Sequence, residues 1–517
     1  MRFTRRSFLK LSGAAAIAPL ALRPFAIGNA KAASLCRQLQ ADALRPQYHL
    51  MPASNWMNDP NGPIFFRGQY HMFHQYDPDG ATWGNMHWAH AVSPDMVHWT
   101  HEPTAIAPTP NGFDRDGVFS GSAVLDGDVP TVIYTGVLPP SSDAETTLRD
   151  GKHVWREVQC LAVSKDPGLR TWKKLPDPVI SAPPAGMKVT GFRDPCVWRE
   201  DGAWWLVLGS GTRERGGGIL LYRSTNLRKW KYVHSMIENG PSGKNTTNPV
   251  DDGDMWECPD FFALGGKHVL LISTMGKVLW KAGTYKGRRF TPEKEGVVDH
   301  GAYYAAKSML DHDGNRILWG WIPETRPESQ FSAAGWAGAM SLPRVLSLNS
   351  EGELAMDVAP TVEQLRGNHT GFQAGTAREI KERVISEVRL SNLSAELRAE
   401  VQPQSSRKAE LRLLGGKGEP FASIAVADGP RGRELNVNGI LAPVGGPAGS
   451  PVRVHASVDA SVLEVFANET VVITARVYRA PSGPLRLKVE GDPGIVALDV
   501  WQMTPISKNR LTSPLCD

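Results

Sequence analysis

The chain has 517 residues, which is too long for one ordinary domain and makes two domains the natural expectation. Its composition, 41% hydrophobic and 21% charged, provides ample apolar material for packed cores and excludes a low-complexity protein. The 51 glycines and 39 prolines favour many turns and short elements over long helices, and the formal net charge at pH 7 is +4.

Residues 1–32 have the pattern of a twin-arginine export signal. The segment 4–10, TRRSFLK, carries the paired arginines, an apolar run follows from Leu11 to Leu22, and Ala30-Lys31-Ala32 offers a cleavage site. The alternative is a transmembrane anchor, but the apolar run is shorter than the ~20 residues that a membrane span needs. We therefore expect export by the twin-arginine pathway, with a periplasmic or secreted product and no stable membrane anchor.

The basic surplus belongs to this leader. Six of the 57 basic residues lie in it and none of the 53 acidic ones, which leaves the mature chain with a balance near −2. A chain so balanced predicts no nucleic-acid partner and no attraction to a membrane surface.

The five cysteines predict no metal site, because none forms a C-x-x-C pair and zinc-ligand spacing is absent. Export permits disulfides, and Cys36 and Cys516, near the two ends of the chain, are a candidate pair.

Short apolar or aromatic runs, broken by Gly, Pro, Asp and Asn, fill residues 45–358. They include residues 70–76, 129–134, 203–208, 268–272 and 316–321. Because no helical period is sustained between them, these runs predict strands. Their spacing of roughly 50 to 70 residues suits four-stranded propeller blades better than a solenoid, although composition alone also fits a sandwich.

The sequence pattern changes after residue 358. Residues 359–370 predict a linker, with a short helix in the sequence APTVEQLR. From 371 to 510 polar and apolar residues alternate, as in residues 409–414 and 485–489, which is typical of antiparallel strands with one buried face in a β-sandwich. The fold class is therefore all-β, and we expect the second domain to be structural or ancillary.

Three carboxylates in the first domain lie in short motifs rich in proline, glycine and aromatic residues. Asp59 lies in NDPNG, Asp194 in GFRDP and Glu257 in DMWECPD, each just before a predicted strand. Taken singly, each is a commonplace turn residue. A propeller, however, brings the inner strands of successive blades together around its axis, so we expect the three acids to converge on one funnel.

Such a site suits glycoside hydrolysis, which needs two carboxyl groups in different protonation states. Glu257 is the better acid, because Trp256 and the nearby carboxylates favour a protonated carboxyl group. Asp59 is the better nucleophile, held ionised by backbone donors of its turn. Arg193 is expected to keep Asp194 ionised and aimed at sugar hydroxyls.

The motifs WMNDPNG, FRDP and WECPDF, in this order and spacing, resemble glycoside hydrolase family 32, the β-fructofuranosidases, which include invertases, inulinases and levanases. The likeness covers most of the mature chain. It implies a five-bladed propeller joined to a β-sandwich, action on terminal β-linked fructosyl units with retention of configuration, and no metal or organic cofactor.

By this resemblance Asp59 matches the nucleophile, Glu257 the acid/base and Asp194 the stabiliser of the transition state. The residues expected to bind the fructosyl unit are Asn58, Gln75, Trp83, Phe119, Ser120, Arg193, Tyr304 and Trp321. Alternatives stay open: the two tryptophans could pack blades, Ser120 could satisfy a turn, and Gln75 could bond backbone.

Departures from the family pattern bear on substrate choice rather than on reaction type. Ala302 stands where many members carry Asp, and polar segments at 138–157 and 239–252 predict loops at the rim of the funnel. The expected function is release of fructose from sucrose or from fructans such as inulin and levan. A fructosyltransferase is the alternative, and a non-catalytic fructan-binding protein is disfavoured because all three acids are present. The oligomeric state stays open.

Overall fold

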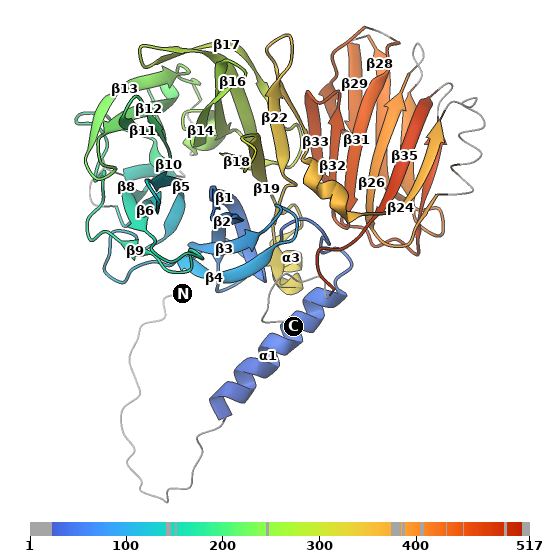
Figure 1. Ribbon diagram of the computed structural model, residues 1–517, viewed down its shortest axis with the longest axis horizontal. Coiled ribbons are helices and arrows are strands. Elements are labelled where there is room, and N and C mark those ends of the chain that lie inside the picture. Colours follow the sequence, from blue (N-terminus) through green and yellow to red (C-terminus); the bar gives the residue numbers. More distant parts are fainter. Residues whose placement is uncertain are drawn as a thin grey trace, which may run out of the picture.

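The computed structural model describes residues 23–140, 146–149, 152–244, 248–373, 384, 388–403, 408–430, 432–447, 449–490 and 494–508. Within these residues the chain forms seven β-sheets, five as radial blades and two packed face to face (Figure 1). The expected all-β architecture, a five-bladed propeller followed by a C-terminal sandwich, is confirmed.

The blades follow one another in chain order. Their strands are β1 (Asn55–Phe66), β2 (Gln69–Asp77), β3 (His87–Ser93) and β4 (Thr100–Ile106); β5 (Val118–Asp126), β6 (Val129–Leu138), β7 (Thr146–Arg149), β8 (Lys152–Val163) and β9 (Lys173–Lys174); β10 (Gly191–Glu200), β11 (Ala203–Thr212), β12 (Gly216–Ser224) and β13 (Trp230–Glu238); β14 (Glu257–Leu264), β15 (Lys267–Thr274), β16 (Lys277–Lys286) and β17 (Arg289–Val297); and β18 (Tyr304–Leu310), β19 (Arg316–Ile322), β21 (Ala339–Met340), β22 (Arg344–Leu348) and β23 (Leu354–Val358). Strand β20 (Trp336–Ala337) pairs in parallel with β1, so residues late in the propeller sequence close onto the first blade. The first strands of neighbouring blades contact one another and are therefore the innermost.

The middle strands bury both faces, because each blade is packed between two others. In β11, Leu206 and Leu208 belong to the apolar cluster on one side, whereas Trp205 and Val207 belong to the cluster on the other. This explains why such strands are nearly continuous apolar runs rather than alternating ones.

A β-bulge interrupts the pairing of every innermost strand near its start. The interruptions lie between Met57 and Pro60, Phe119 and Gly121, Arg193 and Cys196, Glu257 and Asp260, and Tyr304 and Lys307. A bulge re-aims side chains and tolerates proline, which has no N–H for the ladder. The Asp-Pro and Cys-Pro pairs of the sequence thus mark the kinks of three blades, and the bulges of all five blades turn side chains toward one end of the axis.

Three bulges hold a non-glycine residue in the left-handed region. Asp194, Cys258 and Ala305 have φ of 65°, 47° and 53°. Such angles are uncommon outside glycine and cluster at functional sites, where the surrounding structure holds them.

The sandwich consists of two six-stranded sheets, in the orders β24-β35-β26-β31-β32-β33 and β25-β34-β27-β28-β29-β30. Their bounds are β24 (Arg366–Gln373), β25 (Arg389–Leu390), β26 (Ser394–Val401), β27 (Ala409–Leu414), β28 (Pro420–Gly429), β29 (Gly432–Val437), β30 (Ile440–Pro443), β31 (Val452–Asp459), β32 (Val462–Ala467), β33 (Val471–Arg476), β34 (Leu485–Glu490) and β35 (Ile495–Met503). In β34 the buried Leu485, Leu487 and Val489 alternate with more exposed residues, as predicted.

The two domains are joined by a 3₁₀ helix, η1 (Pro360–Leu365), and β24 already begins at Arg366, inside the segment predicted as a linker. The guanidinium of Arg366 donates to both carboxylate oxygens of Glu396 at 2.7 and 2.6 Å, which ties this residue to the sandwich sheet.

Three helices complete the described chain: α1 (Arg23–Ala41), α2 (Pro249–Asp252) and α3 (Glu328–Ala334). Helix α1 extends from the body of the molecule (Figure 1), and its C-terminal part packs Leu35 and Leu39 into an apolar cluster with Trp336. It runs through the predicted cleavage position of the leader. Nowhere in the described segments is a helix both long enough and apolar enough to cross a membrane.

Cys36 of α1 is disulfide-bonded, and Cys516, its candidate partner, lies outside the described residues.

Candidate active site

A cavity of about 590 Å³ lies at the bulged ends of the innermost strands. It is lined by every residue that the sequence singled out, namely Asn58, Asp59, Gln75, Trp83, Phe119, Ser120, Arg193, Asp194, Glu257, Tyr304 and Trp321. The structure thus brings the eleven predicted site residues together from all five blades. Their individual roles stay predictions.

Asp59 is held by side chains of the first two blades. Ser120 Oγ donates to its Oδ2 at 2.6 Å and Asn58 Nδ2 donates to its Oδ1 at 3.0 Å. Asn58 is itself oriented by Trp56, whose indole nitrogen donates to Asn58 Oδ1 at 2.7 Å. The expectation that backbone donors hold Asp59 was therefore wrong about the donors, because the bulge turns the carboxylate toward neighbouring side chains.

Burial raises the pKa of Asp59 above its ordinary value, and the hydrogen bonds from Ser120 and Asn58 oppose this rise. These two donors are therefore what favours the ionised form that a nucleophile requires.

Asp194 and Asp59 share a neighbour, Cys258. The backbone N–H of Cys258 donates to Asp194 Oδ2 at 2.9 Å, and the Cys258 thiol lies 3.4 Å from both this atom and Asp59 Oδ2. Burial raises the pKa of Asp194 to about 7; the charge of Arg193 opposes the rise, and the negative charges of Glu257 and Asp59 add to it.

Arg193 binds Glu257 and a fourth acid. Its Nη2 and Nε donate to Glu257 Oε1 at 2.8 and 3.0 Å, and its Nη1 donates to Glu157 Oε1 at 3.0 Å. The prediction that Arg193 aims Asp194 was thus wrong about the contact. The guanidinium orients Glu257, and only its charge acts on Asp194.

Glu257 is held at both oxygens, since the hydroxyl of Tyr304 donates to Oε2 at 2.8 Å. Its side chain is 21% exposed, whereas that of Glu157 is fully buried. Of the two acids that Arg193 binds, Glu257 is therefore the one available to a bound substrate. Glu157 is buried and holds the other side of the guanidinium.

The wall of the cavity offers aromatic faces. The rings of Trp83, Phe119 and Trp155 lie with centroids 5.4 to 5.9 Å apart, and Trp83 is 42% exposed. The indole nitrogen of Trp321 is buried without a hydrogen-bond partner among the described residues, although its ring packs near Trp56. Flat aromatic faces in a cavity wall are suited to stacking against a sugar ring.

Gln75 fits the alternative considered from the sequence, because its Nε2 donates to the backbone oxygen of Val118 at 2.9 Å, although it also lines the cavity.

Several lining residues escaped the sequence analysis. They are Trp56, Trp155, Asn248, Val250, Asp251, Gly276, Gly301, Tyr303, Pro323 and Thr325. Trp155 lies in the segment 138–157 that was predicted to be a rim loop, and a tryptophan in such a segment was the available signal. Glu157 and Cys258 gave no comparable signal as partners of the acids.

No set of three or more His, Cys, Asp and Glu side chains in the described part of the chain is arranged to hold a metal ion. Two carboxyl groups of the site have different partners. Hydroxyl and amide donors hold Asp59, whereas a guanidinium and a phenol hold Glu257. Such a pair can supply a nucleophile and a proton donor to one bound sugar.

Comparisons with known proteins show which family the chain resembles. Residues 49–357 match the glycosyl hydrolases family 32 N-terminal domain, and residues 361–502 match the family 32 C-terminal domain. A sucrose-6-phosphate hydrolase of Zymomonas mobilis is 35% identical over 465 residues, covering 84% of this chain and 86% of the relative. A raffinose invertase of Escherichia coli is 40% identical over 337 residues, which is 62% of this chain and 66% of that protein.

Among solved structures, fructan 1-exohydrolase IIa from Cichorium intybus in complex with 1-kestose has a TM-score of 0.74 at 26% identity and covers 90% of this chain and 98% of its own. A Bombyx mori β-fructofuranosidase variant in complex with sucrose has a TM-score of 0.73 at 26% identity, covering 94% of this chain and 99% of its own. The chain belongs to glycoside hydrolase family 32 and is a glycosidase.

Proposed function

We propose that the protein releases terminal β-D-fructofuranosyl units from sucrose or from the ends of fructan chains, with retention of configuration. The observation that carries this proposal is the convergence of Asp59, Asp194 and Glu257 on one cavity, with a different set of partners around each acid. Relatives named as an invertase and a β-fructofuranosidase, one of them bound to sucrose, support this choice of substrate.

In the first half-reaction the carboxylate of Asp59 attacks the anomeric carbon of the fructosyl unit, and Glu257 protonates the departing oxygen. Ser120 and Asn58 fix the attacking carboxylate, and Arg193 and Tyr304 fix the acid. The products are a fructosyl-Asp59 ester and the free alcohol of the leaving group.

In the second half-reaction Glu257, now a carboxylate, takes a proton from water as the water oxygen displaces Asp59. Asp194 accepts hydrogen bonds from fructose hydroxyls, and these strengthen as positive charge develops on the sugar ring.

The test uses Asp59→Asn and Glu257→Gln, with Asp126→Asn, an exposed acid of the same propeller, as the control. Each site variant should fold normally and lose sucrose hydrolysis by roughly 10³-fold or more, because nucleophile and acid each act only in the transition state. With an activated aryl β-D-fructofuranoside, Glu257→Gln should accumulate a fructosyl group on the peptide that contains Asp59. Wild-type turnover by either variant contradicts the proposal.

Product profiles of the purified enzyme on sucrose, inulin and levan decide the chain substrate. The same experiment separates hydrolysis from transfer to a sugar hydroxyl, since a transferase yields oligosaccharides rather than free fructose at high sucrose.

We also propose export through the twin-arginine pathway. The paired Arg5 and Arg6 motivate this, and the disulfide at Cys36 suits an oxidising compartment. Export should stop when both arginines become lysine, and unchanged appearance outside the cytoplasm contradicts the proposal.

A further inference from the structure

Strand β33 of the sandwich lies directly against the part of the cavity wall that the fifth blade contributes. This part, the blade V wall, comprises Gly301 to Tyr304 together with Trp321, Pro323 and Thr325. The backbone N–H groups of His300 and Ala302 donate to the carbonyls of Val472 and Thr474, both at 2.8 Å. A Cβ at Gly301 would lie 1.8 Å from the backbone oxygen of Thr474, so only glycine allows the two backbone segments to approach this closely. Gly301 and Ala302 line the cavity, so this part of the wall is hydrogen-bonded directly to the edge strand of the sandwich.

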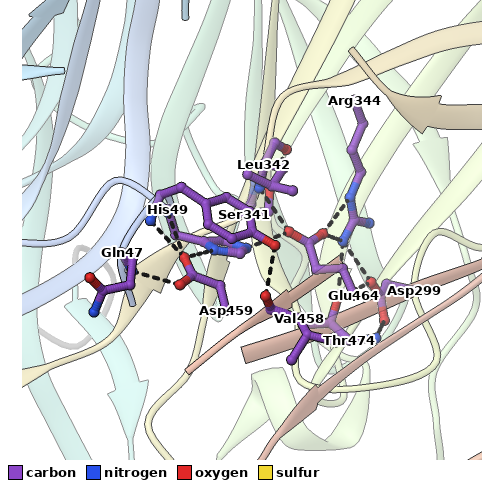
Figure 2. A network of polar contacts seen from close by, with 12 residues as sticks. Gln47, His49, Asp299, Ser341, Leu342, Arg344, Val458, Asp459, Glu464 and Thr474 are labelled. Atoms are coloured by element: carbon purple, nitrogen blue, oxygen red, sulfur yellow. Dashed lines mark hydrogen bonds and ion pairs between the residues drawn. The ribbon is translucent and has the colours of Figure 1, made fainter. Parts of the chain in front are cut away.

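A buried ionic network fixes this junction (Figure 2). Asp299 accepts hydrogen bonds from Thr474 N at 2.9 Å, Thr474 Oγ1 at 2.6 Å and Arg344 Nη2 at 2.9 Å. The backbone N–H of Gly301 donates to the same carboxylate at 2.8 Å. Thr474 thus binds Asp299, at the start of the wall, through both its backbone and its side chain.

A second contact from the sandwich reaches the neighbouring part of the wall. The hydroxyl of Tyr478 donates to the buried Glu324 and accepts from Thr325 N at 3.4 Å, while Arg476 Nε donates to it at 2.7 Å. Thr325 lines the cavity together with Pro323. Two segments of one wall therefore depend on two neighbouring residues of the second domain.

The same wall carries Tyr304, whose hydroxyl donates to Glu257 Oε2. We infer that the sandwich positions the general acid: Thr474 and Tyr478 fix the blade V wall, and the wall fixes Glu257 through Tyr304. This inference rests on the proposed role of Glu257. It gives the second domain a part in catalysis, where the sequence suggested a structural or ancillary one.

The test compares two substrates that differ in their need for protonation. Sucrose has a strongly basic leaving oxygen, whereas the phenolate of an aryl β-D-fructofuranoside departs with little help from an acid. Thr474→Val keeps the shape of the side chain but removes its hydroxyl from Asp299, and kcat/KM for sucrose should fall roughly tenfold through misplacement of the acid. The value for the aryl fructoside should stay within about twofold, and Thr474→Ser should restore sucrose turnover.

Tyr478→Phe is the second variant and should show the same selective loss on sucrose. Tyr70→Phe is its control, because it removes a hydroxyl that contacts His312 at 2.6 Å and lies outside the cavity lining. Thermal unfolding is recorded for all variants, and turnover is measured well below each midpoint. Selective loss in Thr474→Val and Tyr478→Phe supports the inference.

An equal loss on both substrates, or no loss, overturns the inference, since a smaller folded fraction reduces both activities alike. Glu257→Gln tells this failure from that of the proposed function. If Glu257→Gln discriminates between the substrates and the sandwich variants do not, only the inference fails. If Glu257→Gln does not discriminate, the proposed acid role itself fails.

Discussion

Two clusters of three acids in the described part of the chain differ in how completely they are paired with cations. The cavity cluster is Asp59, Asp194 and Glu257, and the interface cluster between the two domains is Asp299, Asp459 and Glu464 (Figure 2). The interface cluster is fully buried and is shared between two cations, Arg344 and His49. The cavity cluster has a single cation among its described lining residues, Arg193, which it shares with a fourth acid.

The pKa directions follow this difference. Burial raises the pKa of Glu464, but the charge of Arg344 and the contacts of His49 outweigh it and bring the pKa to about 2. In the cavity burial prevails, and the pKa of Asp194 rises to about 7. Buried acids that are fully paired hold domains together, whereas under-paired acids remain available for proton transfer and for a substrate.

The largest effect on stability should come from the interface cluster. Glu464→Gln leaves Arg344 and His49 short of a counter-charge in a dry interior, and the free energy of unfolding should fall by about 3–5 kcal/mol. Urea denaturation measures this change. Glu295→Gln is the control: Glu295 is 67% exposed in its pair with Lys281 and should contribute less than about 1 kcal/mol. A loss as small as that of the control would show that the interface acids are not structural.

The cavity cluster should respond in the opposite sense. Asp194→Asn removes a stabiliser of the transition state, so sucrose turnover should fall by about 10²–10³-fold. The same change removes a negative charge that the fold disfavours. Because the folded pKa lies above the ordinary value, the ionised form destabilises the fold at pH 8, and the thermal midpoint at that pH should rise. A lower midpoint together with retained activity would break the comparison.

The sequence predicted the cavity cluster because its signals are local. Asp59 and Asp194 precede prolines that mark bulges, and a propeller must bring such bulges to its axis. The partners of the acids were not predictable in this way. Arg193 lies 64 residues before Glu257 and 36 after Glu157, and no pattern in the chain says which acid its guanidinium meets.

The role of the second domain was missed for the same physical reason. Thr474 lies within β33, a strand of nearly continuous buried residues, and Tyr478 lies two residues beyond its end, so nothing in the local sequence sets either residue apart. Their contacts with Asp299 and Glu324 span 175 and 154 residues and exist only after the domains dock. The periodicity of a sequence shows which face of a strand is buried, but it does not show which residues pack on that face.

The pH dependence of stability sharpens the comparison through histidines. Burial lowers the pKa of His49, but its bonds to Asp459 and Glu464 outweigh burial and raise the pKa to about 9. This stabilisation is complete below the ordinary value of 6.5 and is lost as the pH rises toward 9. Burial lowers the pKa of His74 and His101, in β2 and β4 of the first blade, to about 4 and about 3, so their stabilisation is complete above 6.5 and is lost as the pH falls.

Unfolding free energies at pH 5, 7 and 9 test both directions. His49 alone should lower the value by about 2 kcal/mol between pH 7 and 9. His49→Gln should be less stable than the wild type at pH 7 and should lose this alkaline decline, while the decline toward pH 5 persists. If the variant and the wild type decline equally toward pH 9, the network does not depend on a charged His49.

The smallest expected effect concerns the one cation of the cavity cluster. Arg193→Lys keeps the positive charge near Asp194 but cannot bridge Glu257 and Glu157, because an ammonium lacks the planar fork of a guanidinium. If Arg193 acts by orienting Glu257, kcat for sucrose should fall about tenfold while KM changes little. Arg213→Lys is the matched control, since Arg213 bridges Asp252 and Asp254 in the same blade and does not line the cavity. A rise in KM at constant kcat would instead make Arg193 a ligand of the fructosyl unit, as the sequence suggested, and would leave Tyr304 as the residue that holds the acid.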